Sequence, residues 1–92
     1  MLRIQAFEKQ SGLIRMLVFL SDRDEYTLSK IWEEANIGTN QGYRSLNKAQ
    51  KLGLIASRID NSSYPPKNMI SLTPKGKKVA ELLKKIEEVL EG

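Results

Sequence analysis

The chain contains no cysteine, no histidine and only three prolines in 92 residues. Without cysteine it can form no disulfide framework and perform no thiolate chemistry, which fits a reducing cell interior. Without histidine it lacks the commonest metal ligand, the commonest general base and the usual pH switch. The longest apolar run, Met16 to Leu20, is far too short to span a membrane. We therefore expect a cytoplasmic protein with neither a metal site nor a cofactor.

Charge is distributed unevenly along the chain. The overall formal charge is +4, yet the segment from Ile37 to Ala80 holds eight of the fifteen Lys and Arg residues and one of the eleven acids, Asp60. That segment carries +7 and the remainder −3. A strongly basic half is the electrostatic pattern of a surface that meets phosphate groups. At this length we expect a single domain over residues 1–92.

The first twenty residues predict an arm followed by a helix. Residues 1–10 alternate like a strand and also suit a helix, so the arm is helical or extended. A helix is expected from Gly12 to about Leu20, and its apolar stripe comprises Leu13, Ile14, Leu17 and Val18. Met16 and Phe19 lie outside that stripe, so something besides the core should cover them.

Two further helices are expected on either side of a tight turn. After a short strand at Tyr26-Thr27, one face of a helix carries Leu28, Ile31, Trp32 and Ala35 at the spacing i, i+3, i+4, i+7. Gly38, in the left-handed conformation, is expected to end that helix. Thr39 then caps a third helix, in which the residues expected to face inward are Tyr43, Leu46 and Ala49. Those expected to face outward are Asn40, Gln41, Arg44, Ser45, Lys48 and Lys51.

After Gly53 the periodicity changes to two, which predicts a β-hairpin. The hairpin runs from Ile55 to Leu72, and its long polar tip contains Pro65 and Pro66. Thr73-Pro74 is a favourable cap and first-turn pair for a final helix ending near Glu91. We therefore expect a helix-turn-helix and hairpin over residues 11–72 and a C-terminal helix over residues 73–92.

These features resemble the winged helix-turn-helix family, in particular small MarR-like transcriptional regulators of archaea and bacteria. The resemblance spans roughly Ser11 to Leu83. It rests on the Leu28 to Ile37 pattern, on Lys51-Leu52-Gly53-Leu54-Ile55 and on Leu72-Thr73-Pro74-Lys75-Gly76. It implies a mostly helical α+β fold with a three-helix core, a wing of two or three strands and a C-terminal helix.

The resemblance also implies that the third helix enters the DNA major groove and that the wing meets the backbone or minor groove. The recognition positions are then Thr39, Asn40, Gln41, Arg44, Ser45 and Lys48, with Lys67 near the wing tip. Many relatives have an Asp-Gly-Arg type of tip, which Tyr64-Pro65-Pro66-Lys67 replaces in this chain.

The chemistry of these side chains suits duplex DNA. Residues suited to phosphate, which they bind by releasing counterions, are Lys48, Lys51, Arg58 and Lys67. Arg44 suits guanine, whereas Asn40 and Gln41 suit adenine, and each good pair contributes about 1 to 3 kcal/mol of discrimination. We interpret the chain as a sequence-specific double-stranded DNA-binding protein, and thus as a nucleoid-associated transcriptional regulator.

Other interpretations fit part of the pattern. A basic helix face is often only a solvated surface, and a winged helix also serves as a protein interaction module or as a chromatin-type protein with low sequence preference. Trp32 and Tyr43 are expected in the core, while Tyr64 either packs on a sugar or shields its own prolines. No catalytic constellation is visible, so we do not expect an enzyme.

Surplus apolar surface predicts a homodimer. Val79, Leu82, Ile86 and Val89 form a heptad-like seam in the C-terminal helix, which one domain cannot easily hide. We expect this helix to pack with the first helix and the arm across a twofold axis. The expected interface comprises Met16, Phe19, Val79, Leu82, Leu83, Ile86, Val89 and Leu90. The sequence does not identify a small-molecule effector.

Overall fold

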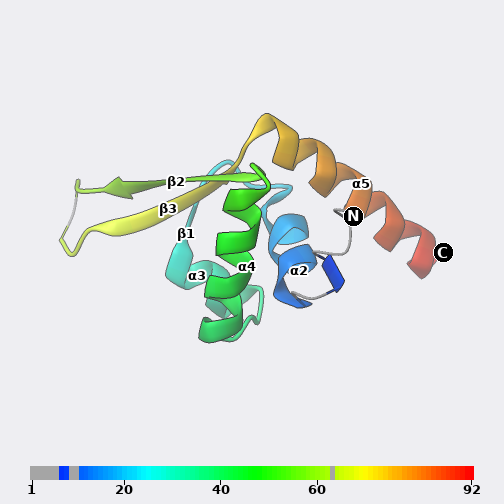
Figure 1. Cartoon of the computed structure of the whole chain (residues 1–92), viewed down its shortest axis with the longest axis horizontal. Helices are drawn as coiled ribbons and strands as arrows, with labels where there is room; N and C mark the ends of the chain where they lie inside the picture. Colours follow the sequence, from blue (N-terminus) through cyan, green and yellow to red (C-terminus); the bar gives the residue numbers. More distant parts are fainter. Residues whose placement is uncertain (1–6, 9–10, 63) are drawn as a thin grey trace.

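The computed structural model describes residues 7–8, 11–62 and 64–92. Its elements, in chain order, are α2 (Ser11–Leu20), β1 (Tyr26–Thr27), α3 (Leu28–Glu34), α4 (Thr39–Lys51), β2 (Ile55–Asp60), β3 (Lys67–Leu72) and α5 (Pro74–Glu91). Figure 1 shows the mostly helical α+β arrangement that the sequence predicts. Phe7 and Glu8 are helical, and the rest of the expected N-terminal arm lies outside the described residues.

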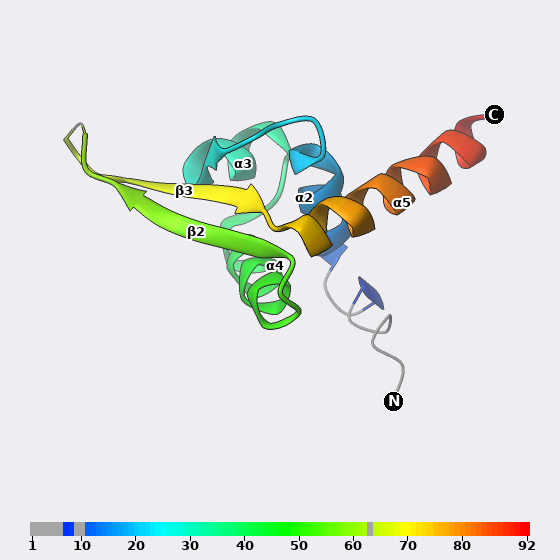
Figure 2. The same cartoon turned by 90° about the horizontal axis from the view of Figure 1, so that it is seen from above.

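The three strands form one antiparallel sheet in the order β1-β3-β2. Tyr26 pairs with Ile70, Ile55 with Leu72, and Asp60 with Lys67. Beyond the short β1, the β2-β3 hairpin projects away from the helices and forms the wing (Figures 1 and 2). Only the base of the wing is buried, and Ile59 near its tip is 61% exposed. The period of two in the sequence therefore predicts the strands correctly. One face of the hairpin is buried, however, only where helices cover it.

The core lies between α2, α3, α4 and the base of the sheet. In α2 the buried face consists of Leu13, Met16, Leu17 and Leu20, each with 0% exposure. Ile14, predicted to be inside, is 39% exposed. The buried face of α2 is therefore rotated about the helix axis relative to the predicted stripe. The reason is that α2 packs against α4 and α5 as well as against the sheet. Met16 is thereby removed from the predicted dimer interface, since its side chain fills the core of its own chain.

The turn between α3 and α4 differs from the prediction at two positions. Thr39 was expected to cap α4, yet Gly38 is the N-cap and Thr39 is the first residue of the helix. Asn36 has the positive φ of 56°, whereas Gly38 precedes α4 with a φ of −63°. Asparagine tolerates the left-handed region better than most residues, so it can end a helix in place of glycine. The Arg15 guanidinium donates a hydrogen bond of 2.8 Å to the carbonyl of Asn36. Ile37, in the same turn, is buried.

The base of the wing is joined to α5 through Thr73. Its backbone N–H donates to the Leu54 carbonyl at 3.0 Å, and its hydroxyl donates to the Gly53 carbonyl at 2.6 Å. The same hydroxyl accepts a hydrogen bond of 3.0 Å from Gly76 N–H, so Thr73 caps α5 as predicted. A Cβ on Gly76 would lie 1.8 Å from the Leu54 carbonyl oxygen, so only glycine allows this close contact.

None of the helices in the described part of the chain has the length and apolar character needed to cross a lipid bilayer.

Candidate nucleic-acid interface

Helix α4 presents a polar outer face beside the wing. Thr39, Asn40, Gln41, Arg44 and Lys51 are exposed and Lys48 is half-buried, so the structure leaves these predicted contact residues accessible. The amide of Gln50 donates a hydrogen bond of 3.3 Å to the Ser57 hydroxyl on β2. The end of α4 and the wing are thus held side by side (Figure 1).

Ser45 was predicted to face outward, but it lies on the inner face of α4. Its side chain has 0% exposure, and its hydroxyl has no hydrogen-bond partner among the described residues. A Cβ on Gly12 of α2 would be 3.0 Å from this hydroxyl oxygen. Ser45 therefore serves the close approach of α2 and α4 and cannot contact DNA.

Tyr43 shows the opposite error, since it was predicted to be inside and is 48% exposed. Gly42 occupies the inner position, where an added Cβ would lie 2.8 Å from the Trp32 ring. The Tyr43 ring packs edge-on against Trp32, with centroids 5.7 Å apart. A glycine within a helix usually marks a close packing contact. Gly42 was therefore the feature of the sequence that could have shown which face of α4 is buried.

Near the wing tip, Lys67 and Tyr64 are exposed, Tyr64 to 95%. Hydrogen bonds from Ser62 lower the pKa of Asp60, and the charges of Arg58 and Lys67 act in the same direction. Because the pKa of Asp60 is lowered, this carboxyl is ionised at neutral pH and partly offsets the positive charge of the wing.

Arg58, predicted to contact phosphate, forms an ion pair with Glu25. Its Nε and Nη2 atoms donate hydrogen bonds of 2.7 and 2.6 Å to the two carboxylate oxygens. This pair links β2 to the loop before β1, across the width of the three-stranded sheet. Hydrogen bonds from Arg58 lower the pKa of Glu25, and those with Glu25 raise the pKa of Arg58. Arg58 therefore holds β2 to the loop before β1 through Glu25, while its side chain stays 56% exposed.

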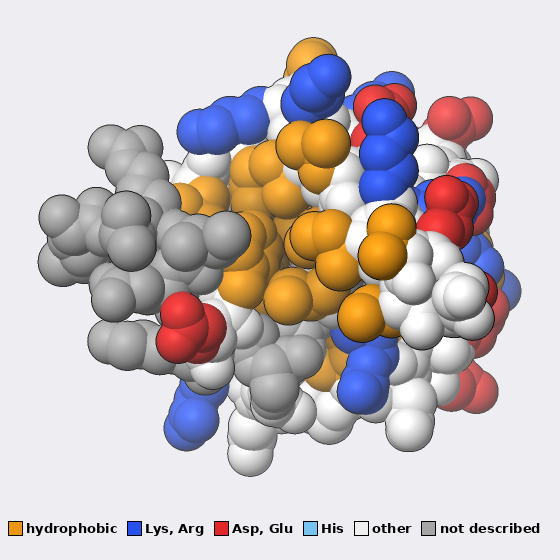
Figure 3. Space-filling model, turned by 90° about the vertical axis from the view of Figure 1, so that its right-hand side faces the viewer, with side chains coloured by type: hydrophobic (Ala, Val, Ile, Leu, Met, Phe, Trp, Pro, Cys, Tyr) orange, Lys and Arg blue, Asp and Glu red, His pale blue; other side chains and the backbone are white. Residues whose placement is uncertain are grey.

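A second surface, on the side of α5, is apolar. The first half of α5 is anchored through buried Ala80, half-buried Val79 and Leu83, and a Lys84–Asp22 ion pair of 2.8 Å. Beyond it, Ile86, Val89 and Leu90 are 56%, 78% and 80% exposed. Figure 3 shows apolar side chains gathered on this side of the molecule.

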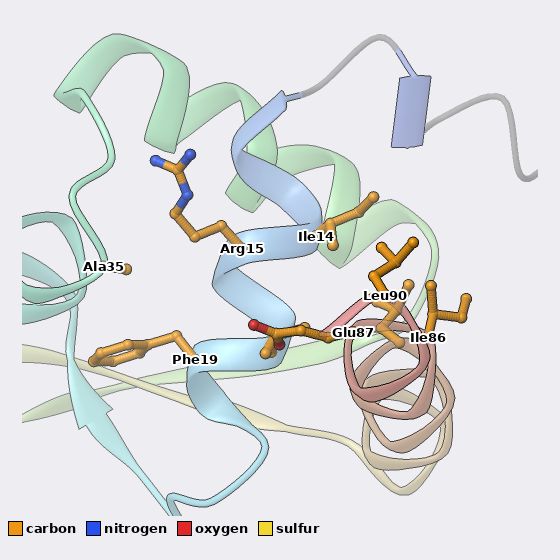
Figure 4. Close-up of a pocket in the computed structure, with 9 residues that line it drawn as sticks. Ile14, Arg15, Phe19, Ala35, Ile86, Glu87 and Leu90 are labelled. Carbon is orange, nitrogen blue, oxygen red and sulfur yellow. The ribbon is translucent and has the colours of Figure 1, made fainter. Parts of the chain in front are cut away.

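Between α2 and the second half of α5 lies a groove of about 650 Å³. Its apolar lining residues are Ile14, Val18, Phe19, Ala35, Leu83, Ile86 and Leu90, and Arg15 and Glu87 are the charged ones. Figure 4 shows Ile86 and Leu90 on α5 across from Phe19 and Ala35. Phe19 is half-buried, because Tyr26 packs on its ring at 5.3 Å and the Arg23 guanidinium covers it at 3.8 Å. In the described part of the chain, no group of three or more Asp and Glu residues is placed to hold a metal ion.

No protein-family model matches the chain. Uncharacterized protein MJ0944 of Methanocaldococcus jannaschii is 39% identical over 78 residues, which cover 84% of the chain and 64% of that protein. The chain thus spans slightly less than two thirds of this relative.

Solved structures with the same fold include a transcriptional regulator homologue from Pyrococcus horikoshii OT3. It aligns with a TM-score of 0.71 at 17% identity, over 100% of this chain and 97% of that one. A mutant form of Lactococcus lactis ZitR, a zinc-responsive MarR family member, aligns with a TM-score of 0.74 at 27% identity. That alignment covers 85% of this chain and 52% of ZitR. The chain has the winged helix-turn-helix fold of MarR-type transcriptional regulators, as the sequence resemblance predicts. The MarR family protein SPO1453 of Silicibacter pomeroyi, which aligns with a TM-score of 0.74 at 19% identity over 95% of this chain and 62% of that one, is also named as a transcriptional regulator.

The Glu25–Arg58 ion pair predicts that the wing is sensitive to acid. Because the pKa of Glu25 is lowered from its ordinary value of 4.5, the stabilisation from this pair is present above pH 4.5. It is lost as the pH falls through the lowered pKa. A carbon-detected NMR titration should give a Glu25 midpoint below 4.5, and Arg58→Ala should return that midpoint towards 4.5. An identical midpoint in both proteins would show that the pair does not form in solution.

Proposed function

We propose that the chain is a sequence-specific double-stranded DNA-binding protein that acts as a transcriptional regulator. The observation that carries the proposal is the exposed polar face of α4 beside a projecting wing, both within the basic segment from Ile37 to Ala80. A helix and a hairpin held side by side match two adjacent grooves of a duplex. The names of structural relatives that are called transcriptional regulators support the same function.

We assign each of these side chains a proposed role from its position. Arg44, one turn into α4, is placed for a base edge, and its forked guanidinium suits guanine. Lys48, Lys51 and Lys67 are placed for phosphates, which they would contact without reading sequence. The start of α4, a 13-residue helix, also offers backbone N–H groups to a phosphate. Arg58 adds to phosphate binding only if it leaves Glu25.

Binding should depend strongly on salt. If four to six cations of each subunit meet phosphate, log K should fall against log salt with a slope of roughly −4 to −5 per subunit. Fluorescence anisotropy with a duplex selected from a random pool would measure this slope between 50 and 200 mM salt, about the range in which such slopes are usually compared. No binding at the lowest salt, or a slope near zero, would refute the proposal.

Arg44 should carry sequence information, whereas Lys51 and Lys67 should not. Arg44→Ala should cost roughly 1 to 3 kcal/mol on the selected duplex and much less on a scrambled one. The matched controls, Lys51→Ala and Lys67→Ala, should weaken both duplexes equally and reduce the slope by about one each per subunit. Equal losses of Arg44→Ala on the two duplexes would instead favour a chromatin-type protein with low sequence preference.

We further propose that the protein acts as a homodimer and that residues 73–92 supply most of the interface. Val79 and Leu83 are half-buried against the core of their own chain. The α5 side chains left for a partner are Leu82, Ile86, Val89 and Leu90, all at least 50% exposed. A second α5 packed across a twofold axis would cover them and, with Phe19, close the groove beside α2. Half-sites would then lie about 34 Å or a multiple of it apart.

A charge in this apolar surface should separate the subunits. Ile86→Asp should give a monomer, because a carboxylate buried against a partner's apolar residues is strongly unfavourable. Lys85→Asp changes the neighbouring exposed position and should leave the dimer intact. Sedimentation equilibrium at tens of micromolar protein would measure both variants, since association follows mass action. A wild-type monomer at that concentration would contradict the homodimer.

A further inference from the structure

A second concavity, distinct from the apolar groove, opens between the start of α3, helix α4 and the wing. It has a volume of about 380 Å³. Ser29 and Lys30 of α3 line it on one side, Tyr43 of α4 on another, and Pro66 and Lys67 of the wing on a third. These residues are far apart in the sequence, and all of them are exposed. We call this concavity the wing cleft.

The wing cleft is basic and has hydroxyl groups at its rim. The ion pairs among the described residues are Arg58–Glu25 and Lys84–Asp22, so neither Lys30 nor Lys67 contacts an acid. The charge of Lys67 is partly balanced by Asp60, its partner in the strand register. Lys30 lies outside the basic segment from Ile37 to Ala80, and the fold brings it to the same concavity as Lys67.

Tyr43 gives the wing cleft a rigid aromatic wall. Its ring is held against Trp32 at a centroid distance of 5.7 Å and an interplanar angle of 70°. Trp32 is itself fixed, since it is 9% exposed and packs against α4 at Gly42. Pro66 adds a second stiff apolar surface. An aromatic ring that is exposed yet held in place is suited to the apolar face of a sugar, and ammonium and hydroxyl groups are suited to phosphate.

We infer that the wing cleft holds the sugar-phosphate backbone of one DNA strand, with Lys30 on a phosphate and Tyr43 on a deoxyribose. This inference rests on the proposed DNA binding. If α4 occupies one groove and the wing the next, the strand that separates the two grooves must pass between them. The wing cleft lies at that position and has the matching chemistry. It adds two contacts, Lys30 and Tyr43, that hold the duplex without reading its sequence.

The salt dependence of binding tests the role of Lys30. Lys30→Ala should reduce the slope of log K against log salt by about 0.9 per subunit. Between 50 and 200 mM salt, wild type should therefore lose about 3.5-fold more affinity per subunit than the variant. Lys85→Ala, an exposed lysine on α5, is the control and should keep the wild-type slope. Tyr43→Ala should weaken matched and scrambled duplexes alike without changing the slope, and Tyr43→Phe, which keeps the ring on Trp32, should retain most of the affinity.

A second measurement locates the phosphate. Neutral methylphosphonates are placed one at a time along the selected duplex, and each is titrated with wild type and with Lys30→Ala. A methylphosphonate at one position between the two grooves should weaken DNA binding by wild type but not by Lys30→Ala. The variant already lacks the lysine that would contact the phosphate charge at that position. If wild type binds DNA but Lys30→Ala behaves like Lys85→Ala at every position, the inference about the wing cleft is wrong and the proposed function stands. If wild type binds no duplex, both are wrong.

Discussion

The arrangement of this molecule depends on one close backbone contact, between Gly76 at the start of α5 and the Leu54 carbonyl at the base of the wing. No side chain fits there, because a Cβ at residue 76 would overlap the carbonyl oxygen. Thr73 completes the junction by binding both Gly53 and Leu54 while capping α5. The end of α4, both long strands and α5 therefore meet within a few residues. The angle between the wing and α4, and the direction in which α5 leaves the domain, are both set at this junction.

Much of the fold could be predicted from local chemistry. The helix and strand boundaries follow from caps, glycines and changes in period, as at Thr73-Pro74 and Gly53, because those signals act between neighbours in the chain. The burial of Ile31 and Trp32 followed from helical spacing in the same way. The prediction of the outer face of α4 was mostly correct, since Asn40, Gln41 and Arg44 are exposed. Which of these contact DNA stays a prediction.

The errors in the turn between α3 and α4 are local, since Asn36 and not Gly38 adopts the left-handed conformation and Gly38 is the N-cap of α4. The other errors concern contacts between different elements of the fold. Met16 and Ser45 were assigned to surfaces, yet both are buried, because α2 packs against more than one neighbour and approaches α4 closely. Tyr43 was predicted to be inside from its spacing to Leu46, but Gly42 is the α4 residue that meets the Trp32 ring at the inner position. The pairing of Arg58 with Glu25 joins positions 33 residues apart, and the wing cleft assembles three separate segments. Periodicity within one element contains no information about such contacts.

The division of α4 into two faces has a consequence for protein engineering. Gly42, Ser45, Leu46 and Ala49 are buried, and Gly42 has no room for a larger side chain. Asn40, Gln41, Arg44 and Asn47 point away from that packing and are exposed. A library randomised at these four positions would vary the outer surface of the helix and preserve the domain that supports it. Under the proposed DNA binding, such a library would allow the preference for a target duplex to be selected independently of stability.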